Sequence, residues 1–232
     1  MWKKSNTLNW RDRLKWKLFQ IRLAFEDPRN TAFDKRYNIE TAREEGLAEM
    51  GVPPNAVERG NRLYRVTWHR LIQKALSGLD IDIHRYTFID YGSGKGKAMF
   101  VASTLPFKAI IGVGYARRLH EIATENCRRY RNVNQKCHSL LPILGDVLNY
   151  SPPSGPIVCF MCNPFDERTL RAVFHSWRMR YQSGQREIRI LYLNMRNTAE
   201  SAKVLREQDW LSVVARNKRF VVLSPSQAPV RR

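Results

Sequence analysis

The stretch that decides the fold is Tyr86–Gly96, which reads YTFIDYGSGKG. Phe88 and Ile89 end an apolar, β-branched and aromatic run that predicts a buried strand closed by Asp90. The glycines at 92, 94 and 96 predict a tight turn, because glycine suits a positive φ or a close approach to a ligand. Residues 95–102 predict a helix. A strand, a glycine turn and a helix in this order are typical of a first Rossmann-like βα unit.

Further apolar runs extend this unit into a sheet. They predict strands over Ala109–Gly114, Leu140–Leu144, Ile157–Met161, Ile188–Leu193, Trp210–Ala215 and Arg219–Leu223. Helical patterns lie between several of them, at about 117–131, 167–180 and 199–207. We predict an α/β fold with a doubly wound, mainly parallel seven-stranded sheet, an antiparallel C-terminal hairpin and an N-terminal helical extension.

The chain divides into three predicted parts. Residues 1–61 form a basic N-terminal helix and a connector with short helical turns around Thr41–Met50, 62–225 form the Rossmann-like domain, and 226–232 form a tail. One helical stripe carries Trp10, Leu14, Leu18, Ile21 and Phe25. This segment, residues 1–25, either lies peripherally on an anionic membrane, docks to a partner, or packs on the core of the chain.

The composition indicates a folded, strongly basic protein. The formal net charge is +19 and the isoelectric point is about 10.3, which predicts attraction to nucleic acid, an acidic protein or an anionic membrane face. No apolar run is long enough to predict a transmembrane segment, and no secretory signal is evident, so we expect a cytoplasmic protein. Cys159 and Cys162 have the spacing of a metal knuckle, but on a strand they should face opposite sides.

The glycine turn, with Asp90 before it, has the spacing Asp-x-Gly-x-Gly-x-Gly. It resembles motif I of the class I S-adenosylmethionine-dependent methyltransferases, in which the turn cradles the methionine end of the cofactor. The resemblance implies that S-adenosylmethionine is bound by Asp90, Gly92, Gly94 and Gly96. The lead-in Phe33–Tyr37 with Thr41 and Ala42 resembles that of small uncharacterised bacterial members.

Two later junctions complete the implied cofactor site. Asp146, beside Val147, matches the family acid that accepts from the adenine amino group, although Gly-Asp pairs also favour plain turns. The family acid that grips the ribose hydroxyls is replaced by Gly114, followed by Tyr115. The missing acid leaves three alternatives. Tyr115 or a lead-in residue replaces it, the affinity for the cofactor is weak, or the catalytic activity has been lost.

Asn163-Pro164-Phe165 follows the fourth predicted strand of the sheet. It resembles a shortened Asn-Pro-Pro-aromatic motif of amino-group methyltransferases, and it also fits a simple turn. The resemblance implies that Asn163 and Pro164 accept hydrogen bonds from the target nitrogen while Phe165 packs the substrate, with no metal. We therefore expect N-methyl transfer to a protein lysine or a nucleic-acid amino group. The alternative is a catalytically impaired adaptor that binds RNA or an anionic membrane.

Overall fold

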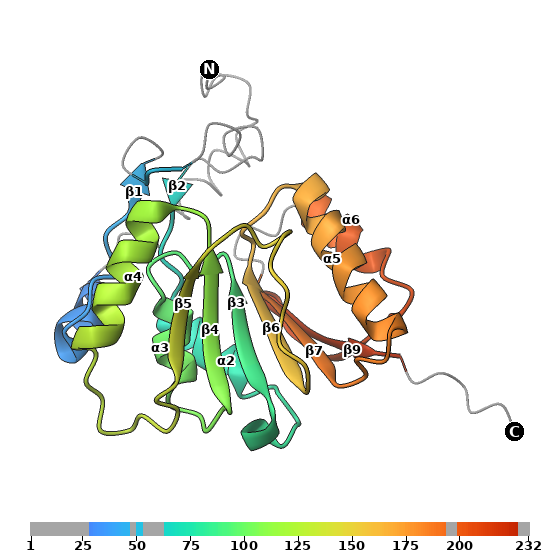
Figure 1. Cartoon of the computed structure of the whole chain (residues 1–232), viewed down its shortest axis with the longest axis horizontal. Helices are drawn as coiled ribbons and strands as arrows, with labels where there is room; N and C mark the ends of the chain where they lie inside the picture. Colours follow the sequence, from blue (N-terminus) through green and yellow to red (C-terminus); the bar gives the residue numbers. More distant parts are fainter. Residues whose placement is uncertain (1–27, 47–49, 53–62, 194–198, 227–232) are drawn as a thin grey trace, which may run out of the picture.

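The computed structural model describes residues 28–46, 50–52, 63–193 and 199–226 of the chain. A central sheet lies between two layers of helices, and a small two-stranded sheet stands beyond one end of it (Figure 1). The predicted helix of residues 1–25 lies outside the described residues.

The elements follow the predicted order closely. The strands of the main sheet are β3 (Thr87–Tyr91), β4 (Ala109–Gly114), β5 (Leu140–Leu144), β6 (Ile157–Cys162), β7 (Ile188–Leu193), β8 (Leu211–Arg216) and β9 (Phe220–Pro225). The helices are one over residues 28–37, α2 (His69–Leu76), η3 (Ile83–Arg85), α3 (Lys97–Ala102), α4 (Arg117–Arg129), α5 (Glu167–Gln182) and α6 (Ala199–Arg206).

The main sheet has the strand order β5-β4-β3-β6-β7-β9-β8. All pairs are parallel except β7 with β9 and β9 with β8, so the predicted antiparallel C-terminal hairpin is confirmed. The order reverses at β3, which has β4 on one side and β6 on the other. In open α/β sheets, ligands bind at such a switch point, beyond the carboxyl ends of the strands.

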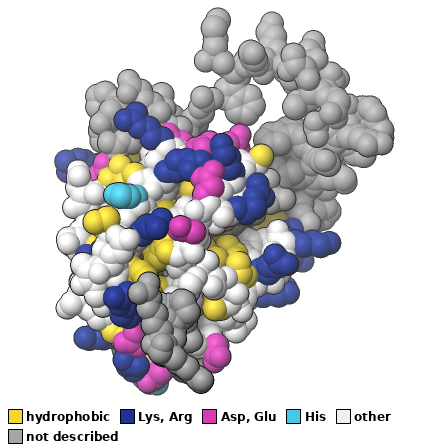
Figure 2. Space-filling view, turned by 90° about the vertical axis from the view of Figure 1, so that its right-hand side faces the viewer, with side chains coloured by type: hydrophobic (Ala, Val, Ile, Leu, Met, Phe, Trp, Pro, Cys, Tyr) yellow, Lys and Arg dark blue, Asp and Glu magenta, His cyan; other side chains and the backbone are white. Residues whose placement is uncertain are grey.

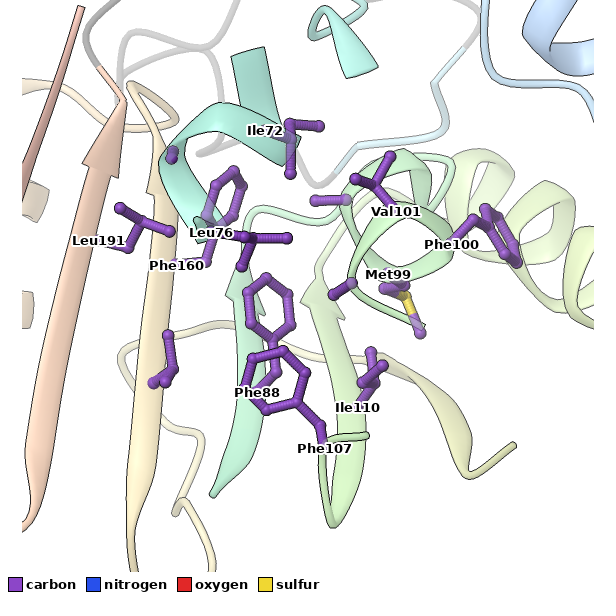
Figure 3. Packing of buried hydrophobic residues seen from close by; sticks show 14 of the residues in the cluster. Ile72, Leu76, Phe88, Met99, Phe100, Val101, Phe107, Ile110, Phe160 and Leu191 are labelled. Carbon is purple, nitrogen blue, oxygen red and sulfur yellow. The ribbon is translucent and has the colours of Figure 1, made fainter. Parts of the chain in front are cut away.

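Each face of the sheet buries its own apolar cluster. One cluster joins α2 and α3 to the sheet and includes Ile72, Phe88, Met99 and Phe160, several of which are labelled in Figure 3. The other joins α5 and α6 to the opposite face and includes Trp177 and Tyr192. Apolar residues at helical spacing in α2, namely Leu71, Ile72, Ala75 and Leu76, explain why this segment packs as a helix.

The expected helical turns around Thr41–Met50 are wrong in part. This stretch contains β1 (Glu45–Gly46), which pairs antiparallel with β2 (Leu63–Tyr64). The buried Glu45 side chain accepts a hydrogen bond from the buried Lys95, and this tertiary contact overrides the local helical preference. The helix over 28–37 was not predicted. Phe33 within it joins the first core cluster, so this polar stretch is anchored by a few buried residues.

The two cysteines of β6 diverge, as predicted. Cys159 belongs to the cluster beneath α5 and α6, whereas Cys162 packs against the cluster on the opposite face. Neither of these cysteines forms a disulfide within the described part of the chain. No helix in the described part of the chain is long and apolar enough to cross a membrane.

Candidate active site

The glycine turn leaves β3 at the switch point of the sheet. Gly92, Gly94 and Gly96 have φ values of +83°, +52° and +87°, which other residues rarely adopt. The amides of Gly92 and Ser93 donate to the Val113 carbonyl of β4 at 2.9 and 3.1 Å. The turn is thus fixed against β4. These positive φ values confirm the prediction that the turn requires glycine at these positions.

A tyrosine from β2 lies directly against this turn. A Cβ placed on Gly94 would come within 2.8 Å of Tyr64 Cδ2. The Tyr64 hydroxyl donates to the Thr41 carbonyl at 2.9 Å, and burial, followed by the carboxylates of Asp34 and Asp90, raises the pKa of Tyr64. The Tyr64 ring of β2 therefore fills the space beside Gly94.

Asp90 is a buried acid at the base of the turn. The residue is 4% exposed, and no hydrogen bond to its carboxyl comes from the described residues. Burial in this apolar setting raises the pKa of Asp90 to about 8. A buried carboxyl without a partner is costly, so this position favours a ligand that brings a positive charge or an N–H donor.

The Asn-Pro-Phe turn packs on the glycine turn. A Cβ placed on Gly92 would lie 2.6 Å from Pro164 Cβ and 4.0 Å from Phe165 Cε1. Because Tyr91 pairs with Met161, both turns leave adjacent strands at the same level. The structure thus brings the glycine turn into contact with Pro164 and Phe165 of the Asn-Pro-Phe turn.

Asn163 has an unusual backbone and a fully engaged amide oxygen. Its φ is +46°, a left-handed value that asparagine tolerates better than most residues. The hydroxyls of Tyr192 and Ser201 donate to Asn163 Oδ1 at 2.8 and 2.9 Å. Asp166 then accepts from the Thr169 amide and caps α5, which fixes the other end of the turn.

The lead-in segment, defined here as residues 28–46, is tied to the glycine turn through Lys95. This lysine is 0% exposed, and its Nζ donates to Glu40 Oε1, Glu45 Oε1 and the Arg43 carbonyl at 2.7, 2.9 and 3.0 Å. A buried ammonium with two carboxylates and a carbonyl is well compensated. The ion pairs therefore fix the lead-in segment beside the turn.

A second set of contacts continues this anchoring. The buried Asp34 carboxylate accepts from the Thr41 hydroxyl and the Ala42 amide at 2.6 Å each, and Lys97 Nζ lies 3.6 Å from it. Asn126 of α4 donates to the carbonyls of both Glu40 and Lys95 at 2.9 and 3.0 Å. The Phe-Asp-x-x-Tyr lead-in noted in the sequence thus shapes the wall of the site.

The remaining predicted residues lie at the β4 and β5 ends. The Gly145 amide donates to the Gly114 carbonyl at 3.0 Å, so Gly114 and Asp146 are close along this edge. Asp146 Oδ1 accepts from the Leu148 amide at 3.0 Å, which is the contact of a turn aspartate. Val147 is buried in the cluster under α5 and α6, which gives it a packing role.

Four residues of this site escaped the sequence argument: Tyr64, Lys95, Tyr192 and Ser201. Tyr192 and Ser201 reach Asn163 from β7 and α6, and Tyr64 comes from β2. Tyr192 could have been found from the sequence, because it places a hydroxyl one residue before the end of an apolar strand. Its nearness to Asn163 also requires that β7 lie beside β6. The sequence around Tyr64 gave no such signal, because its contact with Gly94 joins segments that are 30 residues apart.

The fold is that of class I S-adenosylmethionine-dependent methyltransferases, with the strand order and the C-terminal hairpin described above. A predicted N6-adenine-specific DNA methylase from Listeria monocytogenes str. 4b F2365 matches with a TM-score of 0.51 and 10% identity, over 68% of this chain and 51% of its own. TrmN from Thermus thermophilus matches with a TM-score of 0.50 and 13% identity, over 69% of this chain and 49% of its own.

The magnesium protoporphyrin IX methyltransferase ChlM from Synechocystis PCC 6803, solved with bound SAH, matches with a TM-score of 0.50 and 10% identity, over 68% of this chain and 83% of its own. The chain spans about half the length of the first two structures. No protein-family model matches the sequence. No curated protein matches it either. At these identities, the likeness establishes the fold.

Proposed function

We propose that this protein transfers a methyl group from S-adenosylmethionine to an amino nitrogen of a macromolecule, either a protein lysine or a nucleic-acid base. The observation that carries the proposal is the contact between the two turns at the switch point. The buried Asp90 carboxyl and the glycine turn lie on one side of this contact, and the Asn-Pro-Phe turn lies on the other.

The residues present fit the amino end of the cofactor. Asp90 offers a buried carboxyl that lacks a donor among the described residues, and the methionine ammonium carries both the charge and the N–H groups that it lacks. Gly92, Gly94 and Gly96 have no side chains of their own, and the space that a Cβ would take beside Gly92 and Gly94 is filled by Pro164 and Tyr64. Asp146 remains the candidate for the adenine amino group, and Gly114 and Tyr115 would border the ribose.

When bound, S-adenosylmethionine supplies an electrophilic methyl on a sulfonium. The chain would contribute alignment and exclusion of water, because an in-line displacement by nitrogen needs no metal and no covalent intermediate. No described residue donates to the Pro164 carbonyl, which would accept an N–H of the target. Phe165, partly buried against the second core cluster, would pack the acceptor.

The surface charge supports a macromolecular acceptor. Figure 2 shows basic side chains spread across the face that carries α5 and α6, with acidic side chains between them. Lys and Arg total 40 against 21 Asp and Glu, so the whole chain attracts polyanions. This charge is consistent with either a nucleic acid or an acidic protein.

Two measurements test the proposal. Isothermal titration of the full chain with S-adenosylmethionine should show binding, and extract incubated with the chain and radiolabelled cofactor should yield labelled macromolecules. Separate nuclease and protease treatment then assigns the label. Absence of binding at high micromolar cofactor together with absence of label would refute the proposal.

A second candidate function rests on Gly114. The chain has no acid at the position where the family grips the ribose, and charge-assisted hydrogen bonds contribute roughly 1.5–3 kcal/mol. A basic adaptor that keeps the fold without turnover would bind RNA or anionic vesicles yet show no cofactor titration. The same calorimetry therefore separates the two functions.

A further inference from the structure

We infer that the Tyr64 side chain closes the cofactor site of the free protein, and that the amino-acid end of S-adenosylmethionine displaces its ring from the glycine turn. The inference rests on the proposed function and adds an inhibitory contact to the same site. It also gives a physical reason, apart from any ligand, why the turn carries a glycine at position 94.

The Tyr64 ring lies on the middle glycine of the turn. A Cβ placed on Gly94 would come within 2.8 Å of Tyr64 Cδ2, so the ring covers this side of the turn. The same side chain packs against a small apolar cluster of Met50, Ala116 and Leu119, and Ala116 directly precedes α4. The ring therefore reaches from the end of β3 to the end of β4, which is the part of the switch point that the proposed function gives to the cofactor.

The Tyr64 hydroxyl borders the two groups that would bind an amino acid. Burial is the main cause that raises the pKa of Tyr64, and the carboxylates of Asp34 and Asp90 add to it, because they would repel a phenolate. The Lys95 backbone amide of the turn points to the same hydroxyl and acts against this rise. A carboxyl suits a ligand ammonium, and a turn amide suits a ligand carboxylate. The phenol and the amino-acid end of the cofactor therefore compete for the same space.

The contacts that hold the ring on the turn are few and weak. The Tyr64 hydroxyl donates to the Thr41 carbonyl at 2.9 Å, and Lys95 Nζ lies 5.4 Å from the ring centre. Lys95 Nζ already donates to two carboxylates and a carbonyl, so its ammonium is satisfied without the ring. A ligand that satisfies the turn can therefore displace the ring at a small cost.

The surroundings of the ring are fixed, whereas the ring itself can leave. Thr41 is buried, and its hydroxyl donates to the Asp34 carboxylate at 2.6 Å. Tyr64 is partly exposed, and β2 is held to β1 by backbone pairing. Rotation about the Tyr64 side-chain bonds therefore uncovers the turn without separating the two strands. The measured affinity for the cofactor is lowered by the fraction of molecules in which the site is open.

Two ligands test which part of the cofactor displaces the ring. S-adenosylhomocysteine carries the amino-acid end, whereas methylthioadenosine has the adenosine and the sulfur without it. In calorimetry of the full chain, Tyr64→Ala should bind S-adenosylhomocysteine about tenfold more tightly than the wild type, because the closed state is lost. Its affinity for methylthioadenosine should change less than about twofold, because that ligand does not need the covered part of the turn. A variant that merely loosens the fold would change both affinities together.

Tyr64→Phe tests the hydroxyl and keeps the packing of the ring. It removes the hydrogen bond to the Thr41 carbonyl, so S-adenosylhomocysteine should bind about threefold more tightly. Tyr181→Ala and Tyr181→Phe are the matched controls, because the Tyr181 hydroxyl also donates to a backbone carbonyl, that of Ser226, at 3.3 Å. Tyr181 lies one residue before the end of α5, which leads to the start of β7, so it is remote from the carboxyl ends of the strands. Both controls should keep both affinities.

The outcomes separate the inference from the proposed function. Weaker binding of S-adenosylhomocysteine by Tyr64→Ala would make the ring a part of the binding site and overturn its inhibitory role. Unchanged affinity in both Tyr64 variants, or equal changes for the two ligands, also overturns the inference. In each of these cases the wild type still binds the cofactor, so the proposed function stands. If neither the wild type nor a Tyr64 variant binds S-adenosylmethionine and no macromolecule is labelled, the proposed function fails and the inference fails with it.

Discussion

Asp90→Asn should stabilise the free protein and weaken cofactor binding. The carboxyl has a pKa of about 8 when folded, against an ordinary value of 3.8. The folded state therefore binds the proton more tightly, so stability falls as pH rises from about 4 to about 8 and is constant above that. Asparagine has no charge to desolvate, so Asp90→Asn should remove this loss of stability at high pH.

The magnitude follows from the pKa difference. At pH 7 about three pH units separate the solution from the ordinary pKa, and each is worth about 1.4 kcal/mol, which gives about 4 kcal/mol in favour of Asp90→Asn. At pH 5 the gain should shrink to about 2 kcal/mol. Urea denaturation at both pH values measures it, and Asp80→Asn, at an exposed position, is the control that should show no such trend.

Cofactor binding should respond with the opposite sign. A cation that needs the ionised carboxyl displaces its proton, so affinity should rise up to about tenfold per pH unit between pH 5 and 7. Asp90→Asn should flatten this rise and lower affinity at pH 8. A stability gain that is the same at both pH values, or a variant that binds as well as the wild type, would refute the assignment of Asp90.

Three further predictions concern the walls of the site. Gly94→Val should lower both cofactor affinity and stability, because the new side chain runs into Tyr64; Gly184→Ala, also at positive φ but with open space around it, isolates the backbone strain. Asn163→Ala should lower the turnover rate about 10²-fold with little change in cofactor affinity. Asp146→Ala should weaken cofactor binding and leave the rate at saturating cofactor nearly unchanged. Calorimetry measures the affinities, and initial rates measure the turnover of both variants. Lys95→Met should lower the free energy of unfolding by about 3–5 kcal/mol, because the buried Glu45 loses its 2.9 Å partner and keeps the longer 3.6 Å contact with the exposed Arg43. An unchanged denaturation midpoint would contradict that role of Lys95.

The sheet could be predicted from the sequence because its signals are local. Each strand is a short apolar run with turn residues at its ends, and the glycine turn fixed the position of the first unit. The mainly parallel layout with its C-terminal hairpin also agrees with the resemblance to a known family. The contact between Gly92 and Pro164 follows from the pairing of β3 with β6, which the structure supplies.

The parts that could not be predicted depend on contacts between distant segments. The sequence assigned Lys95 no role beyond the start of a helix, yet it is fully buried and binds two glutamates 50 and 55 residues earlier in the chain. Likewise, Asn163 was expected to offer its oxygen to a substrate, and nothing near it in the sequence indicated that Tyr192 and Ser201 already bind that atom. Side-chain partners of this kind follow only from the folded chain.

Gly114 offers a gain-of-function test of the whole arrangement. A Cβ at this position meets its nearest atom, Ser93 Oγ, at 3.5 Å, which is ordinary contact, so an aspartate can be accommodated without moving the turn. If the ribose of the cofactor lies beside the end of β4, Gly114→Asp should add charge-assisted hydrogen bonds worth about 1.5–3 kcal/mol and tighten cofactor binding by about 10- to 100-fold. Gly145→Asp, one residue past the end of β5 and with open surroundings, adds the same charge nearby and should not tighten it. Because a disruptive substitution cannot raise affinity, tighter binding by Gly114→Asp alone would place the ribose at this strand end, and equal affinity in both variants would contradict that placement.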